Sequence, residues 1–157
     1  MEIRKIDQLD RKEIDEFIAC QWLSLQMVVH GESIDLSTAD GWYVYQDNEV
    51  IGLITYRVSD DEMEILSLDS LRENQGIGSA LLNKAILEAQ DNGISRITLI
   101  TTNDNLPALR FYQKRGFDIV RFFYNAIEQS RRLKPEIPLL GMYGIPLKHE
   151  IELEMKL

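Results

Sequence analysis

Two segments of the chain combine residue types and spacings that could do chemistry. The first is Gln75-Gly76-Ile77-Gly78-Ser79, which stands between a predicted strand and a predicted helix. Glycines there let the backbone approach a ligand closely, and the N–H groups at a helix start have no partner within the helix. Together with the positive end of the helix dipole, this arrangement favours a phosphate or pyrophosphate. Taken alone, the motif fits a tight strand-to-helix turn without a ligand equally well.

Two familiar phosphate-binding loops do not match this segment. The Gly-x-x-x-x-Gly-Lys-Ser/Thr loop would need a lysine that the segment lacks. The Gly-x-Gly-x-x-Gly loop fails because position 81 is Leu81. The segment therefore belongs to neither of these nucleotide-binding classes.

The second segment covers residues 105–117 and is predicted to form a short helix. Asn105 can cap this helix, and Pro107 suits its first turn. Residues four apart share one face of a helix, so Ala108 and Tyr112 lie together. Taken alone, Asn105 is better explained as a helix cap and Tyr112 as a packed aromatic residue.

Together, the two segments resemble the motifs of the GNAT superfamily of N-acetyltransferases. The first is similar to the family's acetyl-CoA motif, Gln/Arg-x-x-Gly-x-Gly/Ala. The second is similar to the family's Asn-x-x-Ala-x-x-x-Tyr-x-x-x-Gly-Phe pattern, with matches at Asn105, Ala108, Tyr112, Gly116 and Phe117. The resemblance extends from about residue 42 to residue 117, and the flanking segments are compatible with it.

One position departs from the family pattern. Glu73 stands where the family usually has Gln or Arg. A carboxylate beside a pyrophosphate is electrostatically unfavourable unless it faces away, and Arg72 could compensate by swinging in. Because the cradle works mainly through backbone N–H groups, we expect binding to survive this change.

The resemblance implies a binding role for two groups of residues. The N–H groups of Gln75, Gly76, Ile77, Gly78 and Ser79 would hold the pyrophosphate of CoA. The pantetheine arm would lie where strands 62–70 and 94–102 splay apart. Backbone groups of Leu68, Asp69 and Ser70 would bind this arm and polarise the thioester carbonyl.

The resemblance also implies direct attack by an amine on acetyl-CoA. Asn105 would contact the cofactor, and Tyr112 would protonate the departing CoA thiolate. A phenol of pKa about 10 can donate to a thiolate of pKa about 8.5 when it is placed beside it. No nucleophilic cysteine is needed, and Cys20 is expected to be buried in the first helix.

A carboxylate on strand 62–70 is the expected general base. Glu64 is preferred because of the Glu-Ile-Leu-Ser-Leu pattern, while an ungapped alignment of the motif favours Glu62, which abuts a turn. A chain of water molecules is the third alternative. Strict alternation along the strand predicts that Glu62 and Glu64 share a face with Leu66 and Leu68, opposite Met63, Ile65, Ser67 and Asp69.

Other charged residues suggest how an acceptor could be chosen. Six acids and one arginine between residues 60 and 73 could draw a cationic amine. Arg131, Arg132 and Lys134 could select an acceptor that carries a carboxylate. His30 is expected at a helix end, and no Cys, His and Asp cluster has metal-ligand spacing, so no metal is predicted.

Periodicity predicts the elements that must position these residues. Asp10 and Glu13 suggest a capping box for a helix at about 10–29, followed by a loop at 31–40. Segment 125–148 is expected to be a structured loop. The strands are expected at 2–6, 42–46, 50–58, 62–70, 94–102, 117–124 and 149–157, and two further helices at 79–92 and 105–116. The prediction is an α/β (α+β) fold, with a single mixed, mostly antiparallel central sheet flanked by helices and one domain over residues 1–157.

Composition limits the functional classes. The 157 residues include 17 Lys or Arg and 26 Asp or Glu, for a formal charge of −9, which argues against nucleic-acid binding. No apolar run approaches the roughly 20 residues of a membrane span, and no signal peptide is evident. One cysteine cannot form an internal disulfide, so a cytoplasmic location is expected.

The sequence therefore predicts a cytoplasmic N-acetyltransferase. It would transfer an acetyl group from acetyl-CoA to a primary amine of a small molecule or peptide in a ternary complex. A non-catalytic acyl-CoA-binding sensor or regulatory module is the alternative. The strand-rich C-terminal end could pair across a homodimer.

Overall fold

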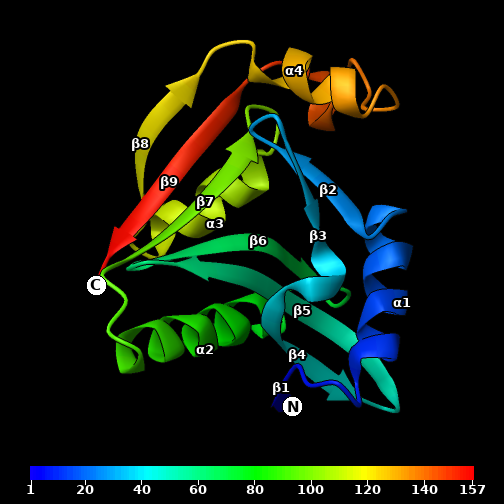
Figure 1. The fold of residues 1–157 in the computed structure, drawn as a ribbon, viewed down its shortest axis with the longest axis vertical. Helices are drawn as coiled ribbons and strands as arrows, with labels where there is room; N and C mark the ends of the chain where they lie inside the picture. The colour runs from blue at the N-terminus through cyan, green and yellow to red at the C-terminus, as the bar shows by residue number, and fades with distance from the viewer. The chain divides into compact units, whose positions relative to one another are not determined.

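The computed structural model describes residues 1–157, which form two compact units (Figure 1). The first unit contains residues 1–26, 35–97 and Leu157. The second unit contains residues 27–34 and 98–156. None of the helices is long and apolar enough to span a membrane.

The first unit is an antiparallel meander covered by two helices. Its strands follow the order β1 (Glu2–Lys5), β4 (Asp40–Gln46), β5 (Glu49–Ser59) and β6 (Glu62–Ser70). The turn between β4 and β5 is formed by Asp47 and Asn48, both with positive φ, as a tight two-residue hairpin requires. These strands lie where the sequence predicted them.

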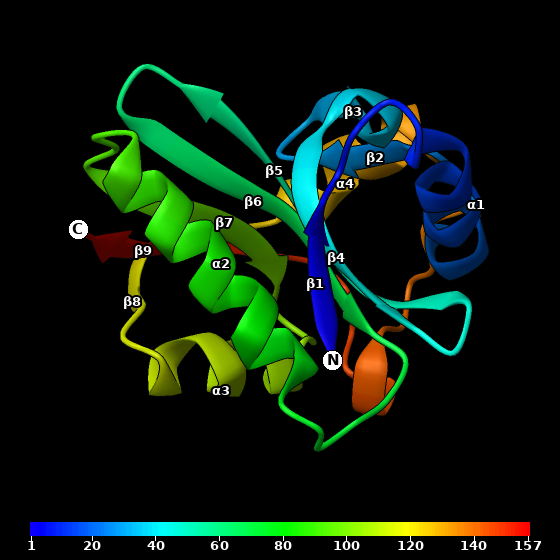
Figure 2. The ribbon, with the colours of Figure 1, turned by 90° about the horizontal axis from the view of Figure 1, so that it is seen from below.

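Both helices of this unit bury one apolar stripe. In α1 (Arg11–Trp22) the buried residues are Ile14, Phe17 and Ile18. Helix α2 (Ile77–Asp91) lies across β4, β5 and β6 (Figures 1 and 2). It buries Ile77, Leu81, Leu82, Ala85 and Ala89. This packing fixes the start of α2 close to the end of β6.

Strand β6 contains a β-bulge at Leu66. Thr55 of β5 pairs with Ser67, whereas the next residue, Tyr56, pairs with Ile65. One extra residue on β6 therefore interrupts the regular alternation of the strand.

The bulge changes which side chains of β6 share a face. Arg57 pairs with Glu64, two positions along β5 from the Thr55–Ser67 pair. Directly paired residues point to the same side of a sheet. Glu64 therefore lies on the face of Ser67, and the prediction that it shares a face with Leu68 is wrong.

Residues 23–35 differ most from the prediction. Helix α1 ends at Trp22, because Leu23 is left-handed with φ 61°. The following residues form a hairpin of β2 (Gln26–Val29) and β3 (Glu32–Asp35), whose turn is His30-Gly31. The helix to residue 29 and the helix-end position of His30 are therefore wrong. A short 3₁₀ helix, η1 (Leu36–Thr38), follows.

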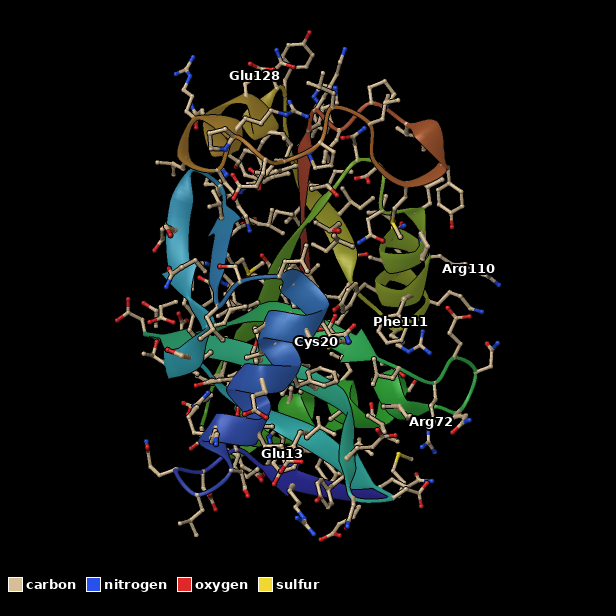
Figure 3. All side chains as sticks on the ribbon, turned by 90° about the vertical axis from the view of Figure 1, so that its right-hand side faces the viewer. Glu13, Cys20, Arg72, Arg110, Phe111 and Glu128 are labelled. Carbon is tan, nitrogen blue, oxygen red and sulfur yellow. The ribbon has the colours of Figure 1, made fainter.

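Two expectations for α1 are also wrong. Asp10 has helical backbone angles and makes no capping hydrogen bond. Asp7 Oδ1 instead accepts hydrogen bonds from the N–H groups of Leu9 (2.8 Å) and Asp10 (3.1 Å). Cys20 is exposed, because it lies off the stripe that α1 buries (Figure 3).

The second unit carries the remaining strands in the order β7-β9-β8, with β8 and β9 antiparallel. Besides the β2–β3 hairpin, its elements in chain order are β7 (Arg96–Thr102), α3 (Leu106–Lys114), β8 (Asp118–Phe123), α4 (Ala126–Leu133), η2 (Met142–Gly144) and β9 (Glu150–Lys156). Helix α4 lies in the segment that was expected to be a loop. The predicted α/β (α+β) class, with helices flanking a mixed, mostly antiparallel sheet, is confirmed.

Gly41 of β4 lies where the first unit leaves no room for a side chain. A Cβ atom at this position would lie 2.0 Å from the carbonyl oxygen of Ile54 and 3.0 Å from Ile6 Cδ1. Gly41→Ala is expected to lower the free energy of unfolding by about 3 kcal/mol, because backbone must move to relieve the clash. Gly93→Ala is the control. Gly93 has φ +70° but no atom within 4 Å of an added Cβ, so only about 1 kcal/mol of backbone strain is expected. Equal losses for the two variants in urea denaturation would contradict this packing.

Candidate active site

The turn from β6 into α2 presents an open helix start. Gly76 adopts a left-handed conformation with φ 74°, and no side chain caps the helix. The first turn contains no acidic residue. The N–H groups of Ile77 and Gly78 have no acceptor within the helix, and the helix dipole adds positive potential. This part of the predicted site can hold an anionic group such as a phosphate.

Arg72 is paired with two acids of the first unit. Its Nη2 atom lies 3.4 Å from Asp47 Oδ2 and 3.5 Å from Glu49 Oε1, at the turn between β4 and β5 (Figure 3). Glu73 is exposed. These long surface ion pairs contribute little stability, so they would not prevent Arg72 from turning toward an anion bound at the start of α2.

The end of β6 is held from the side of α1. Trp22 Nε1 donates a hydrogen bond of 2.9 Å to Asp69 Oδ2. Burial raises the pKa of the Asp69 carboxyl above its ordinary value, and the Trp22 hydrogen bond partly opposes this rise. The Asp69 side chain is thus engaged by α1, so the role predicted for Leu68, Asp69 and Ser70 depends on their backbone groups.

Both candidate bases are held by arginines. Arg57 Nε donates to Glu64 Oε1 at 2.6 Å, across the β5–β6 pair. Arg96 Nη2 donates to Glu62 Oε2 at 2.9 Å. The Glu64 side chain is 19% exposed and that of Arg57 is 39% exposed. Sequence reasoning missed Arg57, because only the strand register shows that it faces Glu64.

A pocket of about 320 Å³ lies at this end of the β5–β6 hairpin. It is lined by Arg57, Ser59, Glu62 and Glu64. Its volume is near the lower end of the range for small-molecule sites. The structure thus gathers Glu62 and Glu64 at a concave polar surface, where a small charged ligand could bind.

Helix α3 positions the other two predicted residues. Asn105 Oδ1 accepts a hydrogen bond of 3.2 Å from the N–H group of Ala108, which confirms Asn105 as the N-cap. The Tyr112 side chain is only 6% exposed. Its ring packs edge-on against Phe111 and Phe117, with centroid distances of 5.1 and 5.3 Å. This packing fixes the ring and hence the direction of the hydroxyl.

Arg131 does not serve as a free anion-binding residue. Its side chain is 14% exposed and donates to the carbonyl oxygens of Ile137 (3.4 Å), Pro138 (2.8 Å) and Leu147 (2.5 Å). It therefore holds the segment that follows α4. The suggestion that Arg131 selects a carboxylate-bearing acceptor is wrong, because these carbonyls occupy its guanidinium.

Two polar residues beside Asn105 hold the same segment. The buried Asp104 accepts a hydrogen bond of 2.8 Å from the N–H group of Met142. Asn103 Oδ1 accepts hydrogen bonds of 3.0 Å from the N–H groups of Lys148 and His149. These contacts were missed in the sequence, since nothing in the spacing pairs residues 103–104 with residues 142–149.

Comparison with known proteins decides the family. The sequence profile of the acetyltransferase (GNAT) family matches residues 6–117. The chain belongs to this family. It is 45% identical over 151 residues to the uncharacterized protein YxbD of Bacillus subtilis, covering 96% of this chain and 95% of that protein.

Solved GNAT structures share the fold. An IAA acetyltransferase from Bacillus cereus has a TM-score of 0.74 at 24% identity, covering 99% of both chains. A GNAT family acetyltransferase from Elizabethkingia anophelis, crystallised with acetyl-CoA bound, has a TM-score of 0.71 at 22% identity, covering 99% of this chain and 97% of that one. Within this GNAT chain, no three His, Cys, Asp or Glu side chains gather as a metal site would require.

Proposed function

We propose that this protein transfers the acetyl group of acetyl-CoA to a primary amine of a small molecule or peptide. The observation that supports this most strongly is the open start of α2, with left-handed Gly76, no side-chain cap and no acid in the first turn. Membership of the GNAT family supports acetyl-CoA as the donor. No metal takes part in the proposed reaction.

The cofactor would be held mainly through backbone groups. The N–H groups of Gln75, Gly76, Ile77, Gly78 and Ser79 would bind the pyrophosphate of CoA. Backbone groups of Leu68, Asp69 and Ser70 would bind the pantetheine arm. Asn105 would contact the cofactor from the start of α3.

The transfer itself would be a direct attack in a ternary complex. Glu64 takes a proton from the acceptor ammonium, which leaves a neutral amine. The amine nitrogen then bonds to the thioester carbonyl carbon, and the carbon–sulfur bond breaks. Tyr112 gives its proton to the departing CoA thiolate, and the extra proton on the amide nitrogen passes to solvent. The products are an N-acetylated amine and free CoA.

A non-catalytic acyl-CoA-binding module is the second candidate. Glu73 favours it, because a carboxylate here departs from the pattern of the family's pyrophosphate loop and Arg72 is paired elsewhere. Acetyl-CoA incubated with a panel of amines distinguishes the two functions. An enzyme yields acetylated amine by mass spectrometry with an equal amount of free thiol. Tight CoA binding without any acetylated amine would favour the module.

A matched pair of variants tests which glutamate is the general base. Glu64→Gln is expected to lower kcat/KM for the amine about 100-fold at neutral pH, because the amide cannot accept the ammonium proton. Glu62→Gln is the control, since it carries the same change beside Arg96 and should keep most of the activity. Affinity for CoA should be unchanged in both variants. A larger loss in Glu62→Gln would assign the base to Glu62, and full activity in both would favour a water chain.

A further inference from the structure

The pocket at the β5–β6 hairpin carries information about the acceptor. If Glu64 takes the acceptor's proton, the acceptor amine must enter this pocket, so any inference about the acceptor's other groups rests on the proposed function. The other charged side chains that line the pocket would then contact the parts of the acceptor beyond its amine. Arg57 is the one cation among the lining residues, and 39% of its side chain is exposed.

We propose that the acceptor is an α-amino acid or a similar small amine with an adjacent carboxylate, and that Arg57 binds this carboxylate. Arg57 Nε and Glu64 Oε1 lie 2.6 Å apart, so the two protein charges are adjacent. A ligand that meets both must also carry its opposite charges close together. An α-ammonium beside an α-carboxylate fits, with its dipole antiparallel to that of the Arg57–Glu64 pair. A guanidinium carries five N–H donors, so it can contact a ligand carboxylate as well as Glu64.

Other amine classes fit this pocket less well. A polyamine would bring a second ammonium toward Arg57, which repels it. A peptide N-terminus has a neutral carbonyl where Arg57 would meet the carboxylate. The pocket volume of about 320 Å³ suits a single small molecule. Arg131, which the sequence suggested as a carboxylate-binding residue, is occupied by backbone carbonyls.

The test compares matched acceptors. Alanine, phenylalanine, glutamate and lysine are each assayed against the corresponding amide and the decarboxylated amine, with free-thiol release and product mass as readouts. The wild-type protein is expected to prefer at least one free amino acid over its amide by roughly 10- to 100-fold in kcat/KM, the worth of a charge-assisted contact. Arg57→Gln should reduce this ratio to near one, whatever its effect on the absolute rate with the amide. Arg57→Lys should restore part of the ratio.

The ratio of kcat/KM for a free amino acid to kcat/KM for its amide separates recognition of the carboxylate by Arg57 from a merely structural effect. Losing Arg57 also changes the surroundings of Glu64, but that change acts on every acceptor alike and cancels in the ratio. Arg96→Gln is the matched control, because it removes a similar ion pair, with Glu62, on an arginine that is 37% exposed. This control should keep the wild-type ratio. CoA affinity and melting temperature show whether each variant is folded.

Each outcome decides the inference. A wild-type protein that acetylates amides or decarboxylated amines as well as amino acids would overturn it and leave the proposed acetyl transfer intact. A folded Arg57→Gln variant that keeps the wild-type ratio would also overturn it, whatever ratio Arg57→Lys shows. CoA binding without acetylation of any acceptor would reject both the inference and the enzymatic function, in favour of the module.

Discussion

Replacing Tyr112 by phenylalanine is expected to lower kcat roughly 100- to 1,000-fold and to leave the KM for acetyl-CoA nearly unchanged. The side chain is buried, and its ring packs against Phe111 and Phe117. Phenylalanine keeps these contacts and removes only the hydroxyl. The loss should therefore fall on protonation of the thiolate in the transition state rather than on folding or cofactor binding.

Steady-state thiol release with a saturating amine measures this effect. Tyr124→Phe is the control, because Tyr124 lies in the same unit and is 77% exposed, so loss of its hydroxyl should leave kcat within about twofold of wild type. Undiminished activity in Tyr112→Phe would remove Tyr112 as the acid. A large increase in KM with unchanged kcat would make it a binding residue instead.

Gly78→Glu is expected to weaken CoA binding by at least about 100-fold without lowering stability. Position 78 lies in the first turn of α2, where the pyrophosphate is proposed to bind. A carboxylate there occupies the anion site and repels a diphosphate. The same carboxylate complements the helix dipole, and Glu is a better helix former than Gly, so the melting temperature should stay equal or rise.

These opposite effects on binding and stability distinguish a ligand site from an ordinary turn. Asn83→Glu is the control, because it adds the same charge at an exposed position of the same helix. It should bind CoA like the wild type, apart from a small loss through long-range repulsion. Equal CoA affinity in Gly78→Glu and wild type, measured by titration calorimetry, would place the pyrophosphate elsewhere.

Much of the fold could be predicted from local patterns. The Asp47-Asn48 turn, Asn105 as N-cap and Gly93 after α2 each follow from the backbone conformations that these residue types favour. The strands of the meander alternate apolar and polar residues or are rich in β-branched residues. These patterns begin and end close to the strand bounds. Helix α4 was missed, and residues 23–35 were misassigned as helix and loop. The apolar residues after Trp22 continue a helical spacing, but Leu23 and the His30-Gly31 turn end the helix and build a hairpin.

The candidate site could be predicted only where its motif is local. Residues 75–79 and helix α3 are each a continuous stretch of sequence, so the spacing of their residues was enough to identify the motifs. The face of Glu64 depends on an extra residue at Leu66, which strict alternation cannot reveal. The Arg57–Glu64 contact depends on strand register, and the role of Arg131 depends on carbonyl groups of a non-repetitive segment. Such contacts are set by tertiary structure, and residue type alone does not specify them.

The central claim is that the backbone at the start of α2 binds the diphosphate of the acyl donor. Calorimetric titration with acetyl-CoA and with acetyl-pantetheine, which lacks the diphosphate together with the adenosine 3′-phosphate, tests it most directly. We predict saturable binding of acetyl-CoA and at least about 100-fold weaker binding of acetyl-pantetheine, since charged contacts contribute several kcal/mol together. No heat with acetyl-CoA, or equal affinities for the two compounds, would contradict it.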